Sequence, residues 1–214
     1  MFIGHFGVGL ALKRAAPRTS LGVLTAAAQT LDLLWPWFLL LGWESVRIDP
    51  GNTAFTPLAF DRYPWSHSLL TAVLWGAAFA IVYGWRTRLW AASLWIAGGV
   101  VSHWILDWIT HRPDLPLTPW SSAKFGLGLW NSVPATLVVE IAMFAGGIWL
   151  YVRTPAARGG SRRIRFWLYV ATLALLYAAN LVGPPPPNTR ILAISALAMW
   201  LLPLWAWWVD RATP

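Results

Sequence analysis

The stretch from residue 89 to residue 109 reads LWAASLWIAGGVVSHWILDWI. It is apolar over about 20 residues, enough to cross ~30 Å of hydrocarbon at ~1.5 Å per residue. Near its end, however, it carries His103 and Asp107 at positions i and i+4. An ionisable side chain inside a membrane segment is costly and usually indicates a functional site. The stretch therefore predicts a membrane protein with a polar site inside it.

Apolar stretches of similar length recur along the 214 residues, of which 57% are hydrophobic and 11% charged. Soluble domains carry charge on roughly a quarter of their residues, so this composition excludes that class. We expect an all-α, multi-pass transmembrane helical bundle of about six spans, forming one membrane domain over residues 1–214. The spans are predicted near residues 20–43, 65–84, 89–109, 130–152, 164–183 and 190–209.

The first dozen residues, MFIGHFGVGLAL, are apolar but too short to span. They predict a short N-terminal helix that enters the membrane partway or lies at its inner face. A signal peptide is not expected, because the basic pair Lys13-Arg14 follows the apolar stretch instead of preceding it. The chain has no cysteine, which excludes disulfides, thiolate catalysis and cysteine-based zinc sites.

The basic residues lie in short connections between the apolar stretches, which argues against a nucleic-acid partner despite the net charge of +8. Alternate connections differ strongly in charge. One side holds 11 of the 16 Lys and Arg residues: Lys13, Arg14, Arg18, Arg86, Arg88, Arg153, Arg158, Arg162, Arg163, Arg165 and Arg211. The other side holds Arg47, Arg62, Arg112, Lys124 and Arg190. The positive-inside rule then predicts that both termini are cytoplasmic.

The ionisable residues of the spans fall at similar depths. Counted from the nearest basic residue, Asp32, His103 and Glu140 lie about 20–22 Å along their helices, and His67 and Asp107 about 28 Å. All five are therefore expected in the outer half of the membrane. His103 and Asp107 also share one helical face, so they can bind one cation together, or the carboxylate can orient the imidazole.

Nitrogen and oxygen ligands from separate helices are typical of zinc, manganese or iron rather than calcium. We therefore predict a divalent metal ion, zinc first, held by Asp32, His67, His103 and Asp107. A proton relay and purely structural packing are the two alternatives. An ion pair is disfavoured because none of the spans has an Arg at this depth. Glu140, which has no polar neighbour on its own span, is the candidate general base or additional ligand.

The order of several short motifs resembles a known family, the predicted membrane-bound metal-dependent hydrolases, which include the LexA-binding inner-membrane hydrolases. The motifs are His5, Asp32, Ser66-His67-Ser68, His103-Trp104-Ile105-Leu106-Asp107 and Pro119. The resemblance covers roughly residues 1–120 and adds His5 to the implied metal ligands. It also implies the inner membrane of a bacterium. Arg62 stands where the family has a further histidine.

A divalent metal lowers the pKa of its bound water and polarises an ester or phosphoester oxygen. The sequence thus favours hydrolysis of an ester or phosphoester, either lipid-linked or soluble, from the outer half of the membrane. Membrane lipids are the expected partners, and an anionic head group would meet Arg62, His111, Arg112 and Lys124 on the outer loops. A proton- or cation-coupled transporter and a non-catalytic membrane scaffold are the alternative functions.

Overall fold

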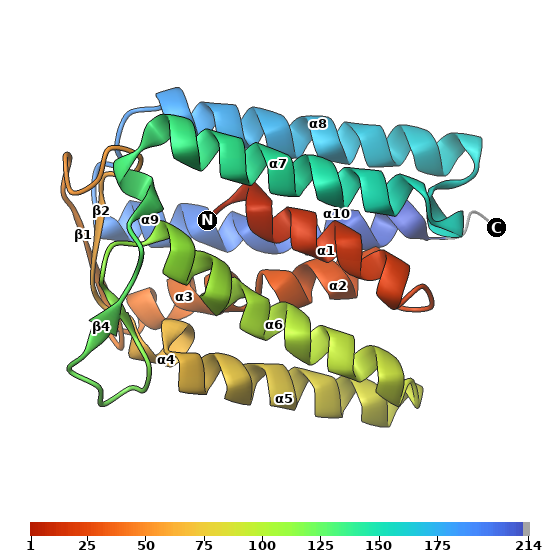
Figure 1. The fold of residues 1–214 in the computed structure, drawn as a ribbon, viewed down its shortest axis with the longest axis horizontal. Helices are drawn as coiled ribbons and strands as arrows, with labels where there is room; N and C mark the ends of the chain where they lie inside the picture. The colour runs from red at the N-terminus through yellow and green to blue at the C-terminus, as the bar shows by residue number, and fades with distance from the viewer. Residues whose placement is uncertain (212–214) are drawn as a thin grey trace.

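All six predicted apolar segments fold as helices in the computed structural model, which describes residues 1–211 (Figure 1). They are α2 (Leu21–Ala28) with α3 (Thr30–Leu40), α5 (Leu69–Thr87), α6 (Trp90–Thr110), α7 (Val133–Val152), α8 (Gly160–Val182), and α9 (Thr189–Leu197) with α10 (Leu201–Asp210). The 3-10 turn η3 (Ala198–Trp200) joins α9 to α10. The chain is thus an α-helical bundle of the membrane type.

The predicted number of six spans is not confirmed. Within residues 1–211, four helices are long and apolar enough to cross a membrane: α5, α7, α8 and the continuous unit from Thr189 to Asp210. The α2–α3 pair gives a fifth only if its halves, which are bent by 59°, count as one span. The helix α6 is long enough, but His103, Asp107 and several other polar side chains lower its hydropathy.

The N-terminal helix α1 (Ile3–Ala15) lies inside the bundle (Figure 1). It packs against α7, where Gly7 and Gly147 let the two backbones approach closely. Its Phe6 and Leu10 are fully buried, and it runs from the centre of the bundle to Lys13 at one end. Of the two expected positions, the helix at the membrane's inner face is wrong and the helix that enters the bundle partway fits, because α1 packs against α2, α6 and α7.

The break between α2 and α3 falls at Gln29. Ser20 caps the start of α2, its hydroxyl accepting from the backbone N–H of Val23. Ala28 ends α2, so its carbonyl is among those left without a partner in their own helix. Asp32 then lies in the first turn of α3. The bend brings this carboxylate toward α6 instead of leaving it on a straight span.

The connections gather at two different ends of the bundle (Figure 1). One end holds residues 16–20, 88–89 and 153–159, the last including the 3-10 turn η2 (Pro155–Ala157), together with the basic residues that flank them. The charge separation read from the sequence therefore follows the long axis of the bundle. Its assignment to the cytoplasm remains a prediction.

The opposite end is covered by two small antiparallel hairpins that the sequence did not indicate. They are β1 (Ser45–Ile48) with β2 (Leu58–Arg62), and β3 (Leu115–Pro116) with β4 (Lys124–Phe125). In the first, Val46 pairs with Phe60 and Ile48 with Leu58. The short helix α4 (Pro64–His67) and the 3-10 turn η1 (Leu129–Asn131) complete this cover.

Two hydrophobic clusters hold the bundle together. One joins α1, α7, α8 and α10, and the other joins α2, α3, α5 and α6. Many large apolar side chains face outward instead, among them Leu74, Ile81, Val138, Leu175 and Leu204. Such an apolar exterior suits a lipid environment and would be unfavourable in water.

Candidate metal centre

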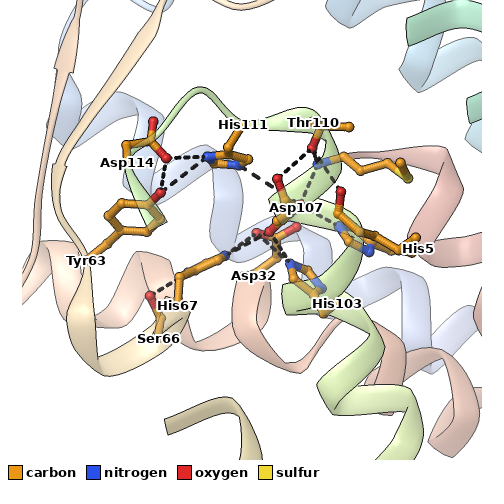
Figure 2. Close-up of polar contacts among 12 residues, drawn as sticks. His5, Asp32, Tyr63, Ser66, His67, His103, Asp107, Thr110, His111 and Asp114 are labelled. Carbon is orange, nitrogen blue, oxygen red and sulfur yellow. Dashed lines mark hydrogen bonds and ion pairs between the residues drawn. The ribbon is translucent and has the colours of Figure 1, made fainter. Parts of the chain in front are cut away.

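Four of the predicted ligands come together from three helices. Asp32 comes from α3, His67 from α4, and His103 and Asp107 from α6 (Figure 2). His67 Nε2 lies 3.5 Å from Asp32 Oδ1 and 3.6 Å from Asp107 Oδ2. His103 Nε2 lies 3.7 Å and 3.1 Å from the same two atoms. Ligand atoms around a tetrahedral metal with ~2.1 Å bonds stand about 3.4 Å apart. Asp32, His67 and His103 bring ligand atoms within 4.8 Å of one another, so these three fit one ion, whereas Asp107 forms a second such group with His103 and His5.

The orientation of His103 is set by the break in the first span. Its Nδ1 lies 2.8 Å from the carbonyl oxygen of Ala28, which can only accept a hydrogen bond. Nδ1 therefore carries the proton, and in the neutral ring Nε2 keeps its lone pair. This Nε2 is fully buried and has no hydrogen-bond partner among residues 1–211. A nitrogen that faces two carboxylates can hold either a proton or a metal ion between them.

His67 is oriented in a similar way, by hydrogen bonds that connect its ring to Ser66 and Glu44. The Ser66 hydroxyl donates to Glu44 Oε2 at 2.6 Å, which uses its only proton. At 2.7 Å from His67 Nδ1, the same hydroxyl oxygen accepts from the ring N–H. His67 Nε2 is then free to face the carboxylates, as metal-binding imidazoles with an oriented second nitrogen do.

Glu44 is anchored at the start of α4. It accepts hydrogen bonds from the backbone N–H groups of Trp65 at 2.8 Å and Ser66 at 2.7 Å. Burial raises the pKa of the Glu44 carboxyl, and the hydrogen bond from the Ser66 hydroxyl opposes that rise. The carboxyl therefore caps α4 and orients the histidine at the same time.

The two carboxylate oxygens of Asp107 contact different residues. Oδ2 faces His103 and His67, whereas Oδ1 lies 3.0 Å from His5 Nε2 and 2.7 Å from the α-amino group of Met1. The His5 ring stacks on the His103 ring, with centroids 3.6 Å apart. His5, His103 and Asp107 also bring ligand atoms within 4.8 Å of one another. His5 thus joins the site either as a ligand or as a hydrogen-bond partner of Asp107.

His111 lies beside this group, just after the end of α6. Its Nδ1 is 3.0 Å from Asp114 Oδ1, and its Nε2 is 4.0 Å from Asp107 Oδ1. The Tyr63 hydroxyl donates to the same Asp114 oxygen. Burial and the Asp114 carboxylate raise the pKa of Tyr63 well above its usual range, so the phenol keeps its proton. All four histidines of the chain therefore lie in one cluster.

Glu140 lies apart from these ligands, although it is fully buried at a neighbouring position on α7. Its Oε2 accepts hydrogen bonds from the backbone N–H groups of Phe2 at 2.8 Å and Gly4 at 3.3 Å, at the start of α1. Thr136, one turn earlier on α7, donates to the carbonyl oxygens of Leu129 and Ser132 and not to Glu140. The partners of Glu140 come from α1, which the sequence did not place there. A catalytic task for Glu140 remains a prediction.

The predicted cationic residues of the outer loops are not drawn into the centre. Arg62 and Lys124 are exposed, and Lys124 donates to the carbonyl oxygen of Asp61. Arg112 lies 3.7 Å from Asp114 and is 40% exposed. A cavity of about 690 Å³ opens onto the centre, and Asp32, His67, Asp107 and His111 line it, but none of these three cations does.

Sequence reasoning missed Glu44, Tyr63 and Asp114. Asp114 follows His111 at i+3, so its proximity was visible in the sequence once this turn was considered. Glu44 and Tyr63 gave no comparable signal. They reach the site only because the β1–β2 hairpin folds over this end of the bundle and returns the chain beside α4.

Residues 1–185 match the family described as YdjM inner membrane protein. The match covers most of the chain, including every residue of the cluster. No curated protein and no solved structure matches.

Proposed function

The chain belongs to this family of inner membrane proteins, and from that premise we propose that it is a membrane-embedded, metal-dependent hydrolase of esters or phosphoesters. The observation that carries the proposal is the buried Nε2 of His103, which lacks a hydrogen-bond partner in the described chain and faces two carboxylates at ligand spacing. Packing alone does not explain it, because a buried polar atom without a partner is costly.

The ligand set favours a transition metal. The two imidazole nitrogens and one carboxylate oxygen of His67, His103 and Asp32 suit zinc, and they also suit manganese or iron. The α-amino group of Met1 offsets the charge of Asp107, whereas Asp32, within residues 1–211, has only the imidazoles of His67 and His103 beside it. When bound, the metal would lower the pKa of a coordinated water and polarise the scissile carbonyl or phosphoryl group.

The protein's own residues supply the remaining tasks. Asp114 holds His111 so that its Nε2 points toward Asp107 and the cavity. His111 is therefore placed to take a proton from an attacking water and return it to the leaving group. For this role the geometry favours His111 over Glu140, because Glu140 does not line the cavity and already accepts from two backbone N–H groups.

The transporter alternative finds less support. From the cluster toward the basic end, the buried face of α1 presents Phe6 and Leu10 before Lys13. The buried face of α6 presents Val100 and Ile96. These apolar side chains offer no relay for a proton or a cation, and the buried polar residues Gln29, Thr25 and Ser93 are uncharged. The arrangement suits a reaction centre that is entered from one side.

Metal analysis of the purified protein tests the proposal. We expect about one equivalent of transition metal per chain under non-chelating conditions, lost in His103→Ala and kept in Glu140→Gln. Metal that is sub-stoichiometric and unchanged by His103→Ala would refute the metal centre. Turnover of aryl ester and phosphoester substrates by His111→Gln and Glu140→Gln then assigns proton transfer to whichever variant loses it.

A further inference from the structure

The cavity beside the metal centre has two chemically different walls. On one side lie the polar residues of the centre. On the other lie mainly apolar side chains from the last helices, including Leu176 of α8 and Leu192, Met199 and Leu202 of the α9–α10 unit, with Asn180 and Ser195 as polar members. A volume of about 690 Å³ is in the range of small-molecule binding sites. The two walls together fit a molecule with a reactive polar group and an apolar chain.

The apolar wall reaches the outside of the bundle on its lipid-facing side. Leu176 and Leu201 both line the cavity, and they are 42% and 63% exposed. They belong to α8 and to the α9–α10 unit, which are long and apolar enough to cross a membrane. The cavity thus opens between two spans, where an apolar chain can enter from the bilayer without crossing water.

Two tryptophans indicate that the polar part of the ligand carries hydrogen-bond acceptors. Trp35 and Trp130 line the cavity and are more than nine-tenths buried. Their indole N–H groups have no acceptor among residues 1–211. Buried indole N–H groups normally find a partner. A ligand with acceptor oxygens, such as an ester group, would supply it.

The charge of the residues that line the cavity indicates whether the ligand is neutral or anionic. Among the described residues, those lining the cavity include no Lys or Arg. Met1 also lines the cavity, but its α-amino group is already paired with Asp107 at 2.7 Å. An anionic phosphate would therefore meet the two carboxylates of the centre with the metal as its only unpaired cationic partner. A carboxylic ester has no formal charge and needs only hydrogen-bond donors.

We propose that the cavity binds a neutral, long-chain acyl ester, which enters sideways from the membrane between α8 and α10. The acyl chain lies against Leu176 and Leu202, and the ester oxygens lie at the indoles of Trp35 and Trp130, beside the metal centre. This substrate class rests on the proposed hydrolase function. The binding site itself does not require the metal.

Photolabelling of the purified full-length protein in nanodiscs tests this binding. The probe is a long-chain monoacylglycerol with a diazirine in its acyl chain, and labelled positions are mapped by peptide mass spectrometry. We expect labelling at the cavity lining that an excess of unlabelled monoacylglycerol removes. Its phosphorylated counterpart, a monoacyl glycerol phosphate, should compete about tenfold less well, which corresponds to about 1.4 kcal/mol.

Matched variants distinguish the cavity from ordinary lipid-facing surface. Leu201→Trp and Leu176→Trp place bulk at its mouth, whereas Leu204→Trp and Leu175→Trp alter exposed leucines outside it, 62% and 70% exposed. The first pair should reduce competable labelling about tenfold, the change expected when two methylene groups are excluded from an apolar site. The second pair should leave it unchanged.

The results also separate this site from the proposed function. His103→Ala should keep the competable labelling, even if it removes the metal. Labelling that spreads equally over Leu175 and Leu204, or that the two competitors reduce equally, would overturn the acyl-ester site. That result would leave the metal centre standing if metal and turnover of short esters persist. If Leu201→Trp and Leu176→Trp do not fold, the labelled positions in the unmodified protein still show whether the probe binds in the cavity.

Discussion

Replacing Gly147 with alanine should loosen the contact that positions α1. A Cβ at this residue would lie 2.2 Å from the carbonyl oxygen of Gly7 and 2.6 Å from its Cα, both backbone atoms that cannot rotate away. The two helices must separate by about 1.2 Å to restore ordinary van der Waals contact. The adjacent Gly146 offers a matched control, since a Cβ there meets nothing within 4 Å.

The two substitutions should change stability in opposite directions. Alanine has a higher helix propensity than glycine by about 1 kcal/mol, so Gly146→Ala should be neutral or slightly stabilising. In Gly147→Ala the overpacking outweighs this gain and costs about 2 kcal/mol. For a chain of this size the melting temperature should then fall by about 4–8 °C. The melting temperatures of both variants are measured by thermal unfolding in the same detergent, with tryptophan fluorescence as the signal.

The shift of α1 should also reach the metal centre. His5 lies on the first turn of α1, with its Nε2 3.0 Å from Asp107 Oδ1, so a moving helix weakens this contact. We expect metal affinity to fall in Gly147→Ala and to stay unchanged in Gly146→Ala. Equal stability and equal metal affinity in the two variants would refute the close packing of α1 against α7.

Four further outcomes are expected. Ser66→Ala should weaken metal binding about 10–100-fold, because it removes the acceptor that orients His67, and Ser66→Thr should restore it in a metal titration. Glu140→Gln should keep the fold and the metal, and loss of its turnover would return the catalytic role to this residue. Lys13→Met should destabilise the protein by about 3–5 kcal/mol, measured by unfolding, because it leaves a buried carboxylate unpaired. Single cysteines in the cysteine-free chain should react with an impermeant reagent from outside the cell at residues 50–56 and not at residues 156–160, and the reverse pattern would overturn the orientation.

The candidate ligands could be predicted from the sequence because ionisable side chains are energetically unfavourable inside apolar membrane segments. Asp32 and His103 interrupt long apolar stretches, and depth counted along each helix placed them near one level. The i, i+4 spacing of His103 and Asp107 fixed their common face. No spacing along the chain, however, could show that His103 donates to the Ala28 carbonyl, because that contact depends on the bend at Gln29.

The span count shows the same limit. Hydropathy correctly located each apolar segment. The polar side chains of α6, however, lower its mean hydropathy so far that it is not among the helices apolar enough to cross a membrane. The sequence left two positions open for α1, because a short apolar helix can enter a bundle partway or lie at a membrane face. The burial of Phe6 and Leu10 and the glycine contact with α7 distinguish the two.

The sequence by itself determined the setting and the chemistry: an apolar helical protein, basic at one end, with imidazoles and carboxylates at one depth. These properties follow from the free energy of transferring each side chain between water and hydrocarbon, which depends on residue type and local pattern. The tertiary structure decided which atoms meet, that Glu44 and Asp114 orient two of the histidines, and that a cavity opens between α8 and α10. Such contacts join residues far apart in the chain, and they exist only once the helices have packed.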